Sequence, residues 1–378
     1  MGREIDDLRQ REFPVTREWA YLNHAVLGPL PERSGRAMRS VIEGQSRSGS
    51  MREGEWEAKV EELRRRTARL IGASPDEIAI LKNTSEGLSL VAHCAGIGPG
   101  DSVVVPECEF PANLRPYIDL ERKGVELRFA RQRDGRIEPE EFERLVDGST
   151  KLVAVSFVQY ATGFRADLAA IAGIAHRVGA LLSVDAIQGL GALRIDVGAL
   201  GVDFLSAGSY KWLLGPVGLG VFWCPGRHLG RLSPPTWGWM GLQTPYDFSN
   251  VRQQPASGAR RFEIGGIGYA DVCGLAESIG LLLEFGPERI ELRVKELTDR
   301  LVAGARERGL AVRSPRGEGE WSGIVSIVPR SDAAAVVARL AERGIVAAPR
   351  AGAVRAAVHF YNTPEEIDRF LEGIDEAV

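Results

Sequence analysis

The sequence predicts an α/β protein, with a mainly parallel sheet in a large domain and a smaller α+β domain at the C-terminus. Its length of 378 residues exceeds the roughly 150 residues of a typical domain and favours two domains. Short β-rich runs alternate with helical stretches, which is typical of a parallel sheet covered by helices on both faces. Several of these runs are uniformly apolar, as strands buried on both faces are.

The elements of the large domain follow from these runs. Helices are expected over 88–94 and 168–178, and strands over 77–81, 102–105, 152–155, 180–184, 204–206 and 218–223. From 224 to 268 the periodicity dissolves into a segment rich in proline and tryptophan, including Trp237 and Trp239. So long a loop is usually functional or part of an interface, and an ordinary surface excursion is the alternative.

The C-terminal part is regular again. An apolar helical stripe formed by Ile290, Val294, Leu297 and Leu301 precedes Gly309, which is placed to end that helix. Strands are expected over 324–328 and 354–360, and helices over 332–343 and from 364 onward, the last with a capping box at 363–366. We therefore expect a large domain over 16–270 and a small one over 271–378, with residues 1–15 packing on the small one.

Composition and charge exclude several classes of protein. The net charge is −4 and no long basic block occurs, so nucleic-acid binding is not indicated. No apolar run approaches a membrane span, and the charged N-terminus is not a signal peptide. The four cysteines show no paired spacing, which favours reduced thiols in a cytoplasmic protein, and the five histidines show no metal-ligand spacing.

Polar residues follow five of the expected strands. They are Thr84, Ser85 and Glu86; Glu107 and Glu109, with Phe110 next; Ser156; Asp185 and Gln188; and Ser206, Ser209 and Lys211. Each group alone is equally explained by helix capping. Because ligands of parallel sheets bind beyond the carboxyl ends of the strands, the five together predict a polar site there.

One lysine stands apart. Only six of the 47 basic residues are lysines, and Lys211 alone lies among bulky apolar residues, in the segment SYKWLLGP. Burial lowers the pKa of an amine and makes it a nucleophile that can form a Schiff base with a carbonyl. The alternative is a lysine whose stem packs while its ammonium reaches water.

Two further features complete a chemical pattern. Thr84, Ser85, Glu86 and Gly87 offer hydroxyls and free N–H groups at a helix start, which suits a phosphate, although for this group alone plain N-capping by Thr84 or Ser85 is favoured. Asp185 at a strand end could hold a protonated ring nitrogen or could merely cap a helix. A phosphate cradle, a carbonyl-accepting lysine and an acid for a pyridinium are together what pyridoxal 5'-phosphate requires.

The segments SVDAIQG at 183–189 and SYKWLLGP at 209–216, with TSEG at 84–87 upstream, resemble the class V aminotransferases. This family, of fold type I, includes cysteine desulfurases, kynureninase and isopenicillin N epimerase-like proteins. The resemblance runs from YLNHA at 21–25 to HFYNT at 359–363 and implies a seven-stranded, mainly parallel sheet flanked by helices in the cofactor domain.

The resemblance also implies roles for single residues. Lys211 would form the internal aldimine, Asp185 would pair with the pyridine nitrogen, and Gln188 would bond the ring hydroxyl. Thr84, Ser85 and Tyr210 would bind the phosphate, and Phe110 would stack on the ring. Arg355 would clamp the substrate carboxylate, for which an arginine fork is suited; a plain charge at a strand end is its alternative. We expect Asn23 and His24, with Trp237 and Trp239, to line the substrate pocket.

Three departures from the family pattern bear on the reaction. The segment 347–353 is short and has no cysteine, which led us to expect that the protein does not form a persulfide as desulfurases do. Phe110 replaces the stacking histidine of desulfurases. Gly266 stands where many relatives place a threonine that reaches the partner's phosphate, which weakens the expectation of a homodimer with active sites near the interface.

The resulting prediction is a pyridoxal-phosphate enzyme that acts on an amino acid and a keto acid by transamination. Racemisation or epimerisation, and β-elimination with C–S cleavage, share the same first steps and stay open. A protein that binds the cofactor without turnover is an alternative of another class, which an intact set of Lys211, Asp185 and Arg355 disfavours. A third interpretation, a nicotinamide-binding α/β protein, is disfavoured because no complete glycine fingerprint follows a strand.

Overall fold

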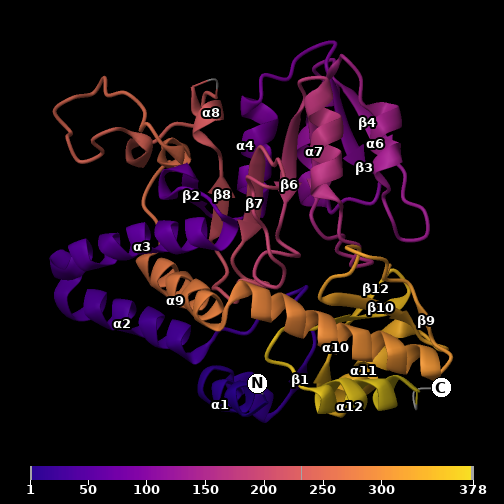
Figure 1. The fold of residues 1–378 in the computed structure, drawn as a ribbon. Helices are drawn as coiled ribbons and strands as arrows, with labels where there is room; N and C mark the ends of the chain where they lie inside the picture. The colour runs from indigo at the N-terminus through magenta and orange to yellow at the C-terminus, as the bar shows by residue number, and fades with distance from the viewer. Residues whose placement is uncertain (1, 231, 376–378) are drawn as a thin grey trace.

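The computed structural model describes residues 2–230 and 232–375 (Figure 1). A seven-stranded sheet has the order β2-β8-β7-β6-β5-β3-β4, and β8 alone among its strands runs opposite to the others. Its strands are β2 (Ile78–Leu81), β3 (Ser102–Pro106), β4 (Glu126–Ala130), β5 (Thr150–Ser156), β6 (Leu181–Asp185), β7 (Phe204–Gly208) and β8 (Gly220–Trp223). The predicted mainly parallel α/β sheet is confirmed.

Both faces of this sheet are covered, as its uniformly apolar strands predict. Along β5, Leu152 and Ala154 belong to one hydrophobic cluster, whereas Val153 and Val155 belong to another. The helices around this part of the chain are α2 (Glu32–Ser48), α3 (Glu53–Ile71), α4 (Thr84–Cys94), α5 (Arg115–Glu121), α6 (Pro139–Leu145), α7 (Leu168–Arg177), α8 (Gly226–Leu229) and α9 (Tyr269–Phe285). None of the helices in the described ranges is long and apolar enough to cross a membrane.

A second, four-stranded antiparallel sheet of order β12-β13-β10-β9 lies toward the C-terminus (Figure 1). It packs with its own hydrophobic cluster against the C-terminal helices. The elements here are α10 (Pro287–Glu307), β9 (Ala311–Val312), β10 (Ile324–Val328), α11 (Ala333–Glu342), β11 (Ile345–Val346), β12 (Ala348–Arg350), β13 (Ala353–Ala357) and α12 (Pro364–Asp375). At the start of α12, Thr363 and Glu366 exchange the two hydrogen bonds of a capping box. A domain boundary at residue 270 stays a prediction.

The N-terminal segment packs on the C-terminal part of the chain. Helix α1 (Gly2–Glu12) contacts the C-terminal part through Arg9, which donates to the carbonyl of Tyr361 and pairs with Glu366. Strand β1 (Ala20–Tyr21) then pairs in parallel with β11. Helix α1 therefore lies beside the C-terminal part of the molecule (Figure 1).

The patternless segment is also irregular in space. Between α8 and α9 the helical elements among the described residues are short turns of 3-10 helix, at Trp239–Gly241 and Ala259–Phe262. It forms the protruding loops beside α8 in Figure 1. Its exposed large apolar side chains are Trp237, Trp239, Tyr246, Phe248, Val251 and Ile264.

Candidate active site

Lys211 lies in a tight loop after β7, with 8% of its surface exposed. Leu214 closes the loop by donating its N–H to the carbonyl of Lys211 at 3.1 Å, and has a positive φ of 56°, a conformation that costs energy in a branched residue. Gly28 approaches so closely that a Cβ there would lie 2.1 Å from the carbonyl oxygen of Lys211. The surrounding chain therefore holds the lysine backbone in one place.

The amine of Lys211 lies between two aromatic rings. Its Nζ is 5.7 Å from the ring centroid of Phe110 and 5.8 Å from that of Tyr210. Burial lowers the pKa of this amine to about 8; Asp185 opposes the shift, whereas Arg355 and Arg350 add to it. A substantial fraction of the amine is therefore neutral, and nucleophilic, close to physiological pH.

Asp185 ends β6 and is 2% exposed. Its carboxylate accepts a hydrogen bond from the N–H of Ile187 at 3.0 Å. Burial raises the pKa of this carboxyl to about 7, and the nearby Glu109 adds to the rise. A buried acid of this kind is suited to a cationic partner such as a protonated ring nitrogen.

Glu109 has a larger role than its place after a strand indicated. It is fully buried and accepts from the N–H and hydroxyl of Ser156 at the end of β5, and from the amide of Gln159. These bonds fix the chain immediately before Phe110. The sequence shows the acid but gives no signal for its partners, because they come from another strand.

The start of α4 is free to bind an anion. Asn83, not Thr84 or Ser85, is its N-cap, and accepts from the N–H of Glu86 at 2.9 Å. The alternative that Thr84 or Ser85 is the cap is thus wrong. The hydroxyls of Thr84 and of Ser206 are buried and have no hydrogen-bond partner among the residues that the structure describes. Orphaned buried hydroxyls beside free helix N–H groups fit the phosphate of pyridoxal 5'-phosphate.

Arg355 brings an unpaired guanidinium to the same place. It lies on β13, is 1% exposed, and donates from Nη1 to the carbonyl of Tyr160 at 2.7 Å. Its Nε and Nη2 atoms are buried without partners. Burial lowers the pKa of Arg355 to about 10, and Arg350 adds to the shift. Two unpaired donors on one fork fit a carboxylate.

Arg350 shares a face of the β12–β13 hairpin with Arg355. Ala348 pairs directly with Arg355, and Arg350 follows Ala348 by two residues, which places its side chain on the same face. Like charges on one face repel. The pair therefore makes the mouth of the site positive.

Some predicted residues are engaged elsewhere. His24 is completely buried, with Nδ1 2.8 Å from the carbonyl of Ala357 and Nε2 2.7 Å from the hydroxyl of Tyr361, so neither ring nitrogen is left for a substrate. The substrate role expected of His24 is not supported by these contacts. Its neighbour Asn23 does keep a buried Oδ1 without a partner.

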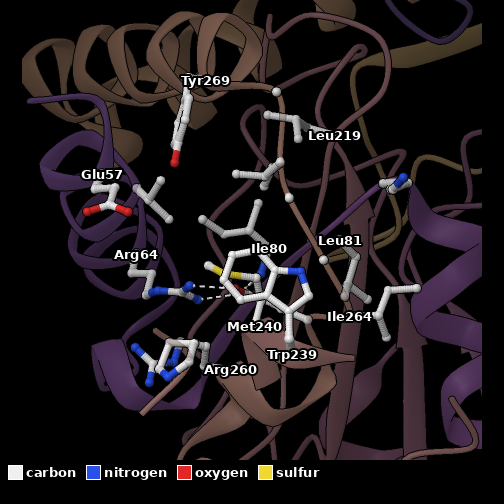
Figure 2. A pocket seen from close by; sticks show the side chains of 18 of the residues that line it. Glu57, Arg64, Ile80, Leu81, Leu219, Trp239, Met240, Arg260, Ile264 and Tyr269 are labelled. Carbon is white, nitrogen blue, oxygen red and sulfur yellow. Dashed lines mark hydrogen bonds and ion pairs between the residues drawn. The ribbon is translucent and has the colours of Figure 1, made fainter. Parts of the chain in front are cut away.

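A cavity of about 540 Å³ (Figure 2) is lined by residues at the start of α4 but not by Lys211. Lys82 and Glu86 line it where α4 begins, and Trp239 and Gly266 line it from the irregular segment; Trp237 does not. Its wall includes Arg64, whose guanidinium pairs with Glu263. A Cβ at Gly266 would meet no atom, so a larger residue would fit there.

The raised pKa of Asp185 leads to a prediction about the cofactor-free protein. The folded-state pKa of about 7 exceeds the ordinary value of 3.8. The folded chain therefore binds this proton more tightly than the unfolded chain, and stability is lost as the pH rises from about 4 to 7. Asp185→Asn removes this loss, so at pH 8 we expect its melting temperature to exceed that of wild type by a few degrees. At pH 4.5 the difference in melting temperature should be much smaller; an equal difference at both pH values would contradict the prediction.

The fold and these residues define a pyridoxal-phosphate enzyme of fold type I. A family model described as aminotransferase class-V matches residues 37–370, so the chain belongs to the class V aminotransferase family, and pyridoxal 5'-phosphate is its cofactor.

Individual relatives match almost end to end. A probable cysteine desulfurase of Methanothermobacter thermautotrophicus is 31% identical over 98% of this chain and 97% of its own length. An uncharacterized aminotransferase, YcbU of Bacillus subtilis, is also 31% identical, over 96% and 95%. The apo structure of a cysteine desulfurase from Thermococcus onnurineus NA1 superimposes with a TM-score of 0.88 at 29% identity, covering 98% of this chain and 97% of that one.

These comparisons correct one prediction. We expected an aminotransferase-like enzyme that transaminates and is not a persulfide-forming cysteine desulfurase. Several relatives at 30–31% identity are named as cysteine desulfurases, and the solved structure at 29% identity is also of a cysteine desulfurase. These findings contradict that prediction. The error lay in treating one short segment without cysteine, 347–353, as decisive for the reaction.

Proposed function

We propose that the protein cleaves the carbon–sulfur bond of cysteine or a closely related amino acid. The observation that carries the proposal is the fork of Arg355, whose Nε and Nη2 find no partner among the described residues, beside the Lys211 amine with its lowered pKa, in a chain several of whose relatives are named as probable cysteine desulfurases. That fork is suited to the α-carboxylate of an amino acid.

Different residues around Lys211 would bind different parts of the cofactor. The start of α4, with Thr84 and Ser85, would hold the phosphate. Tyr210 would lie beside the phosphate. Phe110 would cover one face of the ring, and Asp185 would hold the proton of the ring nitrogen. When bound, the cofactor withdraws electrons from the substrate's Cα.

The remaining residues act on the substrate. Arg355 fixes the carboxylate, which orients the Cα–H bond toward Lys211. The amine of Lys211, with its pKa near 8, takes the proton from Cα and returns one later. The positive face formed by Arg350 and Arg355 stabilises negative charge on the departing sulfur.

A cysteine assay tests this function. The holoenzyme is given cysteine with a thiol that accepts sulfur as a persulfide, and alanine, pyruvate, sulfide and persulfide are quantified. We expect sulfur release in step with alanine or pyruvate. Arg350→Gln should slow sulfur release by about tenfold, yet leave exchange of the Cα proton of alanine in deuterated water unchanged. Exchange in wild type without sulfur release from cysteine would refute C–S cleavage.

We also propose that two copies of the chain associate. The irregular segment exposes Trp237 at 56%, Phe248 at 75% and Val251 at 92%, close to the cavity lined by Gly266. Apolar side chains gathered in this way favour a protein interface. Light scattering of the purified holoenzyme tests this, and a monomer at micromolar concentration would contradict it.

A further inference from the structure

The amide of Gln188 has only one chemically possible orientation. Its Oε1 accepts from the indole N–H of Trp212 at 3.0 Å, and its Nε2 donates to the carbonyl of Ala25 at 3.1 Å. An indole N–H can only donate and a carbonyl can only accept. The two contacts therefore fix which end of the amide is oxygen and which is nitrogen.

One N–H of Gln188 is left over. The amide nitrogen has two protons, and the described residues provide an acceptor for only one of them, the carbonyl of Ala25. Gln188 is 4% exposed and follows the strand-end Asp185 by three residues. The remaining donor is therefore buried at the same sheet edge as Asp185 and Lys211.

Trp212, the residue after Lys211, is held on several sides. It is completely buried, and a Cβ at Gly323 would lie 2.5 Å from its indole ring, so only glycine allows that approach. The imidazole of His24 lies against its face, with ring centroids 5.7 Å apart. The carbonyl of Trp212 accepts from Nε2 of His359 at 3.0 Å.

The two histidines behind Trp212 are neutral and fixed. Nδ1 of His24 faces a carbonyl and must carry the proton, so Nε2 accepts from the hydroxyl of Tyr361. Nε2 of His359 likewise donates to Trp212, and its Nδ1 accepts from the N–H of Phe360. Burial lowers the pKa of His359 to about 4. The indole thus rests on a fully bonded network that does not change its charge near neutral pH.

We propose that Trp212 is a positioning residue, which locks Gln188 so that its second N–H donates to the oxygen substituent on the cofactor ring. This inference rests on the proposed place of the cofactor at Lys211. It does not rest on which bond of the substrate is cleaved. The positioning role accounts for the indole of Trp212 directly after Lys211.

The expected effect is a change in the protonation of the cofactor linked to Lys211. A donor on the ring oxygen draws electron density away from it, so that oxygen holds the proton of the neighbouring linkage nitrogen less tightly. Without the indole N–H of Trp212 the amide keeps only its bond to the carbonyl of Ala25, so its second N–H is held less firmly toward the ring oxygen. The pH midpoint of the visible absorption change should then rise by about half to one unit, the effect of one hydrogen bond.

The test compares single and double variants of the holoenzyme by absorption titration. Trp212→Phe keeps an aromatic ring but removes the donor, and Gln188→Met removes the amide. We expect either change to raise the midpoint, and the double variant to match Gln188→Met alone. Trp223→Phe is the matched control, because it also removes a buried indole donor, the one to Glu77, at a distance from the site.

Each outcome is informative. An unchanged midpoint in Trp212→Phe, or a further rise when that change is added to Gln188→Met, would overturn the proposal. If Trp212→Phe does not fold, benzothienylalanine at position 212 keeps the bicyclic shape and replaces the N–H with sulfur. Failure of C–S cleavage leaves this readout intact, because the titration needs no substrate. A colourless protein in which Lys211 takes up no cofactor would refute both proposals.

Discussion

Replacement of Lys211 by alanine is expected to abolish turnover, with a loss of at least about 10³-fold. The reason is that, in the proposed function, the buried amine near Phe110 and Tyr210 serves both as the attachment point for the cofactor and as the base at Cα. Treatment of the wild-type holoenzyme with borohydride should link the cofactor irreversibly to one peptide, and mass spectrometry should locate it at Lys211. The variant should give no linked peptide.

Lys82 provides the control for this experiment. It is exposed, precedes α4 and lines the neighbouring cavity. Lys82→Ala should keep both the borohydride label and most of the activity. A label that persists in Lys211→Ala would place the attachment on another lysine and overturn the assignment.

The second large effect is expected at Arg355. Arg355→Met should lower kcat/KM for amino acids by about 10²- to 10³-fold, because two charge-assisted hydrogen bonds to the carboxylate are lost. The loss should appear mainly in KM, and amines without a carboxylate should react equally poorly with both proteins. Stability should be maintained or should rise, because the change removes a buried cation whose Nε and Nη2 have no partners.

The matched comparison for Arg355 is Arg64, which is also buried but whose guanidinium has hydrogen-bond and ion-pair partners. Its guanidinium contacts Glu263 and the carbonyl of Ile78. Arg64→Met leaves Glu263 as an uncompensated buried charge and should cost about 3–5 kcal/mol of stability. Equal melting temperatures for the two arginine variants would contradict this account of both sites.

The predictable part of the fold is the part whose signal lies within one segment. Strand β10 occupies the predicted range 324–328, and α7 ends within one residue of its predicted end, since apolar periodicity and caps mark both. Strand β4 was not predicted, because it is an edge strand with half-exposed residues and no apolar run. The antiparallel direction of β8 was not predicted either, since direction depends on the path of the chain and not on composition.

The candidate site divides in the same way. Lys211 and Asp185 are visible in the sequence because a lysine among apolar residues and an acid at a strand end are local signals. The bonds from Glu109 to Ser156 and from Trp212 to Gln188 join residues far apart in the chain, and no spacing rule predicts them. Their roles, like those of the other site residues, stay predictions until the variants are measured.

The cap of α4 by Asn83 has a consequence for how the enzyme is charged with its cofactor. Asn83 caps α4 from within the chain by accepting from the N–H of Glu86, so this bond forms without any ligand. The chain can thus reach its native shape first and receive its prosthetic group afterwards. We therefore expect cofactor binding to be reversible. A preparation stripped of its cofactor should regain activity when pyridoxal 5'-phosphate is added back.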